Sequence, residues 1–271
     1  MKTSELPVLQ TLDLQVGADL VAVLRVDRPE RMNSMTVGMF SDIRSAALAL
    51  RDSDVRAMVL TGTGDRAFCA GFDLDEVGVI AEMGIREFLQ FQELATGSLA
   101  AIRALPFPVI AAVNGAASGG GLSLALACDI RIASTTAKFN AAFVRVGLSA
   151  GELGTSWQLT RLVGPGRAAE IAFTARTVEA DEALRIGLVN RVVPPGHLID
   201  EAMTMAGQIS QNSPGGVRLS KRALHRNQEI GSYAAALELE NRGQALLTRG
   251  DDMTEALTAF KEKRPPTFTG R

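Results

Sequence analysis

Two glycine-rich turns constrain the fold of this chain more than any other feature of its sequence. The first is Ala67–Asp75 (AFCAGFDLD) and the second is Val113–Leu122 (VNGAASGGGL). An apolar run typical of a buried strand precedes each turn, and a segment with helical character follows it. Such a turn presents unpaired backbone N–H groups at the start of a helix, where the partial positive charge lies. Two such turns that face each other would form a hole for an oxyanion.

The apolar pattern around the turns predicts strands that alternate with helices, which is typical of an α/β architecture. The expected strands are Val8–Val16, Leu20–Val26, Val55–Leu60, Val109–Val113 and Ile130–Ala133. One helix is expected to begin near Thr36, and two more are expected at Ile85–Leu105 and Leu122–Cys128. From about Thr155 the pattern is almost wholly helical, with segments at 155–163, 166–174, 179–186, 197–211, 215–227 and 232–260. We therefore predict an α/β core over residues 1–195 and a helical C-terminal region over residues 196–271.

Composition and charge exclude several classes of function. The chain carries 28 basic and 30 acidic side chains, so it lacks the basic excess that a general nucleic-acid binder needs. Its two cysteines, Cys69 and Cys128, exclude a disulfide framework and a four-thiolate zinc site, and with only two, distant histidines we expect no metal. The uncharged stretch Ala104–Cys128 contains prolines and glycines and is not a membrane span. Because Met1–Pro7 has no apolar signal core, we expect a cytoplasmic protein. Both cysteines lie in apolar stretches of the sequence, so we expect their thiols to be buried and reduced.

Two common sequence motifs suggest alternative functions for the chain. Gly62–Ala67 fits the GxGxxA pattern of a dinucleotide site, which requires a helix to start at once, but a further glycine-containing stretch follows instead. Gly147–Gly151 fits the GxSxG pattern of a serine hydrolase, with Ser149 as the nucleophile. Its histidine would be His197 or His225, both of which we expect at the solvated surface.

The two turns, together with the continuation Leu122–Ile130 (LSLALACDI), resemble the crotonase superfamily, which contains the enoyl-CoA hydratases and isomerases. Further segments that agree with this resemblance are Asp27–Pro29, Met32–Met35, Val163–Ala168, Ala180–Val189 and the tail Phe260–Phe268. Together they span nearly the whole chain. The resemblance implies a crotonase-like spiral of ββα units with a helical C-terminal trimerisation region. It also implies a homotrimer or a dimer of trimers.

The resemblance implies an acyl-CoA thioester of fatty acid metabolism as the substrate, with no separate cofactor, because coenzyme A is part of the substrate. By motif position, the thioester oxygen would lie between the backbone N–H groups of Phe72 and Gly120. Coenzyme A would run along Arg28, Asn33, Met35 and the backbone at Phe68, Ala70, Asp73 and Leu74, while Phe260 and Lys263 would reach the coenzyme A of a neighbouring subunit. Ser34 and Met35 stand where family members usually have Ala and Leu. Asp73 and Asp75 lie just after the first turn and could face the site as catalytic acids. Their alternative role is that of acids in the first turn of a helix, where they favour its dipole.

The catalytic acids depart from the family pattern. The two glutamates of well-known hydratases fall at Ser123 and Phe143 in this sequence, so both carboxylates are missing. Ser123 could position a water but is a poor base. Glu152 matches, within one residue, the position where some isomerases of the family carry an aspartate, and partial desolvation would raise its pKa toward that of a general base. The alternative role of Glu152 is to cap the helix expected near Thr155.

These residues favour an isomerase that moves a C=C bond near the thioester through an enolate, with Glu152 as the base. One carboxylate is enough for such a proton transfer, whereas hydration also needs a proton donor and a held water. Three alternatives remain open. They are an enoyl-CoA hydratase with a non-standard acid set, a non-catalytic acyl-CoA-binding scaffold, and a hydrolase built on Ser149.

Overall fold

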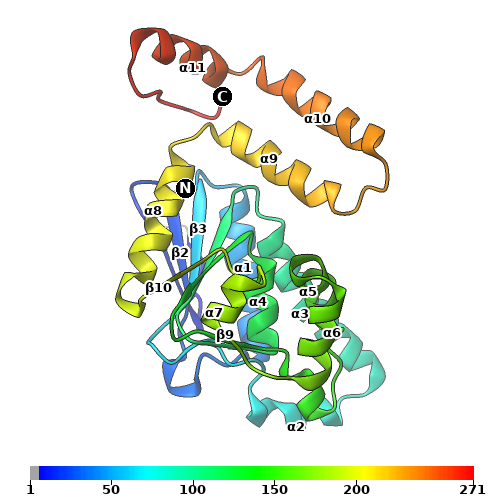
Figure 1. The fold of residues 1–271 in the computed structure, drawn as a ribbon. Coiled ribbons are helices and arrows are strands. Elements are labelled where there is room, and N and C mark those ends of the chain that lie inside the picture. Colours follow the sequence, from blue (N-terminus) through cyan, green and yellow to red (C-terminus); the bar gives the residue numbers. More distant parts are fainter. Residues whose placement is uncertain (1–5) are drawn as a thin grey trace.

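The body of the molecule is a six-stranded sheet flanked by helices (Figure 1). The computed structural model describes residues 6–271, so most of the N-terminal stretch in which we expected no signal core lies outside the described residues. The strand order is β1-β2-β3-β5-β7-β10, and β1 alone runs antiparallel to its neighbour in this sheet of the described chain. The strands are β1 (Leu12–Val16), β2 (Val21–Val26), β3 (Ala57–Gly62), β5 (Val109–Val113), β7 (Ile130–Ser134) and β10 (Arg191–Val193).

A smaller sheet is built from short strands that follow those of the larger one. Its order is β4-β6-β8-β9, with β4 (Ala67–Cys69), β6 (Ala116–Ser118), β8 (Lys138–Asn140) and β9 (Val178–Glu179). β3 leads to β4, β5 to β6 and β7 to β8, and helical segments come after each pair. This repetition confirms the predicted α/β spiral of ββα units. β4 and β6 lie inside the segments that the sequence presents as turns, because strands of 3 residues are too short to show a period of two.

Helices cover both faces of the larger sheet. They are α1 (Val37–Arg51), α2 (Leu74–Glu82), α3 (Ile85–Arg103), α4 (Gly120–Ala127), α5 (Thr155–Val163), α6 (Pro165–Thr174), α7 (Ala180–Arg185), α8 (Leu198–Ser210), α9 (Pro214–Asn227), α10 (Tyr233–Leu247) and α11 (Asp251–Glu262), with 3-10 turns η2 (Pro29–Arg31), η3 (Ala142–Val146) and η4 (Pro195–His197). One face carries the main apolar cluster, and α8 covers the other through a smaller cluster around Ala57, Ile110 and Ala202. Within residues 6–271, none of the helices is both long and apolar enough to pass through a bilayer.

The strand expected at Val8–Val16 begins only at Leu12, so its predicted start is wrong. The carboxylate of Asp42 accepts the backbone N–H groups of Gln10 and Thr11, each at 2.9 Å. A backbone donor that is satisfied by a side chain is lost to the strand ladder. The first residues of the expected strand are therefore tied to α1 instead.

The helix expected over 232–260 is also wrong as a single element, because it breaks between Leu247 and Asp251. Gly250 adopts an extended conformation and starts a new helix. The N–H of Asp251 bonds to the carbonyl of Arg271 at 2.8 Å, so the end of the chain folds back onto this break. The sequence pattern alone does not reveal this contact, since both sides of the break have helical periodicity.

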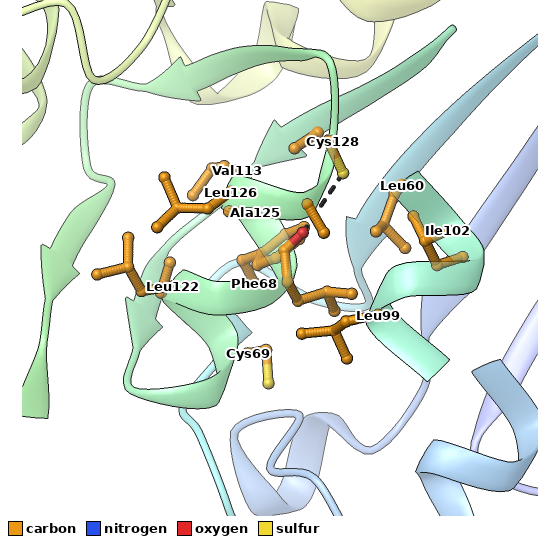
Figure 2. Packing of buried hydrophobic residues seen from close by; sticks show 14 of the residues in the cluster. Leu60, Phe68, Cys69, Leu99, Ile102, Val113, Leu122, Ala125, Leu126 and Cys128 are labelled. Atoms are coloured by element: carbon orange, nitrogen blue, oxygen red, sulfur yellow. Dashed lines mark hydrogen bonds between the residues drawn. The ribbon is translucent and has the colours of Figure 1, made fainter. Parts of the chain in front are cut away.

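The space between α3, α4 and the sheet is filled by apolar side chains. Figure 2 shows Phe68, Leu99 and Cys128 within this cluster. Cys69 and Cys128 are free and buried, as expected, and burial raises the pKa of each thiol to about 12. The thiol of Cys128 donates to the Leu124 carbonyl at 3.5 Å. Both cysteines therefore act as apolar core residues and are not nucleophiles at neutral pH.

The last three helices, α9–α11, extend from the body and are called the arm here (Figure 1). A buried ion pair fastens the arm to the core: Lys221 of α9 lies 2.7 Å from Asp129, which precedes β7, and donates to the Phe107 carbonyl at 2.9 Å. His225 bonds to the other oxygen of Asp129 at 2.8 Å. The expectation that His225 is a solvated surface residue is therefore wrong. Burial lowers the pKa of Lys221; burial alone would raise that of Asp129, but its bonds from His225 and Lys221 lower it.

The expected division of the chain near residue 195 stays a prediction. The helix that follows this position, α8, packs on the sheet of the core. The arm, in contrast, projects beyond the sheet in Figure 1.

Gly121 lets the start of α4 pack directly on the backbone of β4. A β-carbon at Gly121 would lie 1.9 Å from the carbonyl oxygen of Cys69. We expect Gly121→Ala to lower the free energy of unfolding by about 1–3 kcal/mol. Gly97→Ala in α3 is the matched control, because a β-carbon there meets no atom within 4 Å and should stabilise the helix by about 0.5–1 kcal/mol. Urea unfolding measures both, and equal stability of the two variants would contradict the packing argument.

Candidate active site

The two glycine-rich turns lie against each other, and the backbone N–H groups of Phe72 and Gly120 in these turns have no acceptor among the described residues. Gly71 has φ +97°, and a β-carbon on it would lie 3.6 Å from the nitrogen of Gly120. Phe72 forms a parallel bridge with Met35 that uses the backbone groups of its neighbours but not its own N–H. Gly120 begins α4, and its N–H likewise has no acceptor among the described residues. Both groups are therefore free to bind a ligand oxygen.

A largely apolar cavity of about 350 Å³ opens beside these two residues. Phe72 stacks on Phe40 with ring centroids 6.3 Å apart, and Phe91 meets Phe72 edge-on at 5.7 Å. Other apolar side chains that line it are Met35, Leu74, Val77, Ile80, Phe88, Ala95, Ala142, Phe143, Val146, Leu148 and Leu153. Among the described residues, Gln92 and Glu152 are the polar side chains of the lining, and Glu152 is its one carboxylate. A charge in such surroundings is poorly hydrated.

Glu152 reaches the cavity from the loop that precedes α5. Its Oε2 accepts a hydrogen bond from Nε2 of Gln92 at 3.3 Å. Burial raises the pKa of Glu152, and the hydrogen bonds from Gln92 and the Leu153 N–H partly oppose this effect. The backbone carbonyl of Glu152, and not its carboxylate, accepts the Thr155 N–H at the start of α5. The side chain is therefore not the helix cap that we considered as its alternative role.

Ser123 lies behind the cavity and not in it. Its hydroxyl bonds to the Gly119 carbonyl at 3.2 Å and to the hydroxyl of Thr155 at 2.6 Å. The residue is buried and contributes to a separate cavity on the far side of Leu153. In this arrangement Ser123 holds α4 to α5. Phe143, at the other position where a glutamate was expected, does line the main cavity.

A polar network fixes the loop that runs beside the first turn. The carboxylate of Asp73 caps α2 through the Asp75 N–H and accepts bonds from Arg28, Arg31 and Ser34, three of them at 3.0 Å. The Arg31 guanidinium outweighs burial and, with the other donors, holds the pKa of Asp73 well below its usual range. Asp73 thus takes the helix-start role that we considered for it. Its side chain is fully used within the protein.

Comparison of the whole chain with known proteins identifies its family. A family model described as enoyl-CoA hydratase/isomerase matches residues 17–271. This chain belongs to that family. It is therefore an enzyme of the enoyl-CoA hydratase/isomerase family, of the crotonase type that the sequence resembles.

Named relatives of this family member cover almost its full length. A short-chain-enoyl-CoA hydratase from Clostridium acetobutylicum is 42% identical over 246 residues, which are 90% of this chain and 92% of that protein. A crotonyl-CoA hydratase from Syntrophomonas wolfei is 40% identical over 252 residues, which are 93% of this chain and 95% of that protein. The crystal structure of an enoyl-CoA hydratase from Bacillus anthracis covers 97% of this chain and 100% of its own, with a TM-score of 0.91 and 33% identity.

Of the residues expected to contact coenzyme A in this enzyme, some line the cavity, some are buried in the core and others lie far from the cavity. Met35, Ala70 and Leu74 line the cavity. Phe68 is buried in the core, so a ligand can meet only its backbone. The amide of Asn33 is occupied inside the protein, where it accepts from the Arg28 N–H at 3.0 Å and donates to the Ala67 carbonyl at 2.7 Å. Phe260 lies in α11 and Lys263 caps the C-terminal end of this helix, which is at the opposite end of the molecule from α2 (Figure 1).

The motifs that offered alternatives do not assemble into sites in this enzyme. Gly62–Ala67 leads into strand β4 and not into a helix, so the dinucleotide interpretation is wrong. Ser149 is exposed, and its hydroxyl accepts the Gly151 N–H at 2.9 Å. His225 is bound to Asp129 where the arm joins the core. The structure therefore does not bring the nucleophile and base of a hydrolase together.

Gln92 is the polar side chain of the described cavity lining that sequence analysis missed. It lies on α3 among Phe88, Phe91 and Ala95, which have the spacing of one helix face. The signal was a single amide within an otherwise apolar stripe. Its partner Glu152 is 60 residues away, so the pairing is visible only in the fold.

The free energy of unfolding of Glu152→Gln should exceed that of the native enzyme by an amount that grows as pH rises. Burial raises the pKa of Glu152 above its ordinary value of 4.5, so the folded chain binds more protons than the unfolded chain between those two pKa values. The carboxylate therefore lowers stability as pH rises through that window. We expect the variant and the native enzyme to have equal free energies of unfolding at about pH 4 and the variant to be more stable at about pH 8. Urea unfolding at both values checks this, with exposed Glu93→Gln as a control that should show no such difference.

Proposed function

We propose that this enzyme acts on enoyl-CoA thioesters and shifts a C=C bond near the thioester, an isomerase reaction. One observation carries the proposal: the free N–H groups of Phe72 and Gly120 share a cavity with a single carboxylate, Glu152. Hydrogen-bond donors and a base are what an enolate mechanism needs. The apolar wall around them excludes water and strengthens both interactions.

In the proposed reaction, Glu152 takes a proton from the carbon α or γ to the carbonyl. The electron pair of the broken C–H bond moves onto the thioester oxygen, and the resulting enolate is held by the N–H groups of Phe72 and Gly120. The protonated Glu152 then returns the proton to another carbon, so the product has the composition of the substrate. Because burial raises the pKa of Glu152, it is a stronger base than an exposed glutamate.

Hydration of the same double bond is the second candidate. It is supported by the names of two relatives, a short-chain-enoyl-CoA hydratase and a crotonyl-CoA hydratase. In this case Glu152 would take a proton from a water as the hydroxide adds to the β-carbon, and would return that proton to the α-carbon of the enolate. The same pair of N–H groups would serve this reaction.

The contacts with coenzyme A follow from the family resemblance and from the residues that line or adjoin the cavity. We propose that coenzyme A runs past Arg28 and Met35 and along the backbone at Ala70 and Leu74. Asn33 and Asp73 would shape this path without offering their side chains. The enzyme would need no cofactor besides the coenzyme A that its substrate carries.

The assembly and location are also proposals. The arm presents exposed apolar side chains, among them Leu224 and Leu246, and Phe260 is 84% exposed. Burial of this surface between copies would favour a homotrimer or a dimer of trimers. Phe260 and Lys263 would then serve the site of a neighbouring subunit. The cytoplasmic location expected from the sequence stays a prediction.

Incubation with acyl-CoA thioesters in heavy water tests the reaction. We expect 2-enoyl, 3-enoyl or 3,5-dienoyl thioesters to gain deuterium at carbon and to shift the double bond, as read by mass spectrometry. Glu152→Gln should slow this exchange by at least about 100-fold, because it removes the general base. Glu93→Gln, an exposed change on α3, should leave the rate unchanged.

Each other outcome would contradict a stated part of the proposal. A product heavier by one water would favour the hydratase candidate. Full exchange in Glu152→Gln would overturn the role of Glu152. No change in any thioester would overturn both reactions and favour the acyl-CoA-binding scaffold.

Sedimentation equilibrium tests the assembly. We expect the mass of three or six chains for the native enzyme. Leu246→Asp should shift the mass toward a single chain, because it places a charge in the apolar surface of the arm. Leu89→Asp, an exposed change on α3, is the matched control. A native mass of one chain would contradict the proposed assembly.

A further inference from the structure

Gln92 is a polar residue in an apolar wall. On α3 it lies between Phe88 and Ala95, at the helical spacing that places all three beside the cavity. A primary amide in such surroundings lowers stability unless it is hydrogen-bonded. The partner that the structure provides is the carboxylate of Glu152, at 3.3 Å. The amide and the carboxylate are thus the two polar side chains that face the cavity among the described residues, and they face it as a pair.

We propose that Gln92 is the positioning residue of the base: its amide holds one oxygen of Glu152 and leaves the other for proton transfer. This inference rests on the proposed function, in which Glu152 moves the proton. It adds that the orientation and the basicity of Glu152 are set by a neutral donor on another helix.

A neutral donor gives the carboxylate an intermediate basicity. Burial alone favours the protonated form of Glu152, which cannot take a proton from substrate. A cationic partner would have the opposite effect, as Arg31 has on Asp73, and would leave a weak base. The amide of Gln92 stabilises the ionised form without adding a charge. The Gln92 amide therefore favours the ionised form of Glu152 while lowering its basicity less than a cationic partner would.

The loop that carries Glu152 has a constrained backbone next to the carboxylate. The Leu153 N–H next to Glu152 favours the ionised form of this carboxylate, as the Gln92 amide does. Leu153 has φ +50°, a left-handed conformation that non-glycine residues rarely adopt. Strained residues of this kind persist where the surrounding structure fixes them, often at functional sites. The Gln92 amide therefore holds one oxygen of a carboxylate whose backbone neighbour is itself constrained.

Gln92→Met tests the proposal, because methionine has nearly the same shape and no donor. We expect the acidic limb of the kcat profile, measured by exchange in heavy water, to move up by about one pH unit, which is a tenfold loss of ionised Glu152 at a given pH below that limb. KM should change little, since Gln92 holds the base and not coenzyme A. Gln90→Met, on the exposed side of the same helix, is the matched control and should keep the native profile.

Gln92→Glu provides a second readout. It places a second carboxyl group beside Glu152, and repulsion between like charges should move the acidic limb further up than in Gln92→Met. A folded Gln92→Met enzyme with the native pH profile would overturn the proposal, whether its rate is native or uniformly reduced. Full exchange in Glu152→Gln would instead overturn the proposed function, and the positioning role with it. The two failures are therefore distinguishable.

Discussion

The site depends on a contact between two stretches of backbone that have no side chain between them. A β-carbon at Gly71 would meet the Ser118 carbonyl at 2.8 Å, and one at Gly121 would meet the Cys69 carbonyl at 1.9 Å. Only glycine lets the first turn and the start of α4 approach so closely. This approach brings the free N–H groups of both turns to the same cavity. The aromatic wall and the carboxylate are useful only in relation to that pair of donors.

Most polar groups around the cavity already have partners within the protein. Asp73 is saturated by arginine, serine and backbone donors, Asn33 is bonded in the core, and the Ser123 hydroxyl joins α4 to α5. Among the described residues of the lining, the N–H groups of Phe72 and Gly120 and the side chains of Glu152 and Gln92 keep free hydrogen-bonding capacity. Because ligands compete poorly for groups that are already bonded, this distribution directs a substrate to one place. The same distribution makes the loop beside the first turn rigid.

The sequence predicts the parts of this structure that depend on local pattern. The strands of the larger sheet appear as apolar runs, and the glycines mark both turns. The three-residue strands β4, β6 and β8 escape detection because their pairing partners, and not their own periodicity, define them. The direction in which a side chain points also cannot be predicted from the sequence pattern. Ser123 lies close to Gly120 in the chain but points away from the cavity, while Gln92 and Glu152 meet only when α3 packs beside the loop before α5.

The ion pair between Asp129 and Lys221 limits how this protein can diverge. One member belongs to the core and the other to the arm, and both are largely buried. Loss of either alone leaves a charge in a poorly hydrated place, which costs more than the intact pair contributes. A lineage can therefore replace the pair in two linked steps or keep it, but cannot drift at one position freely. Substitutions in the core and in the arm are therefore coupled through this pair.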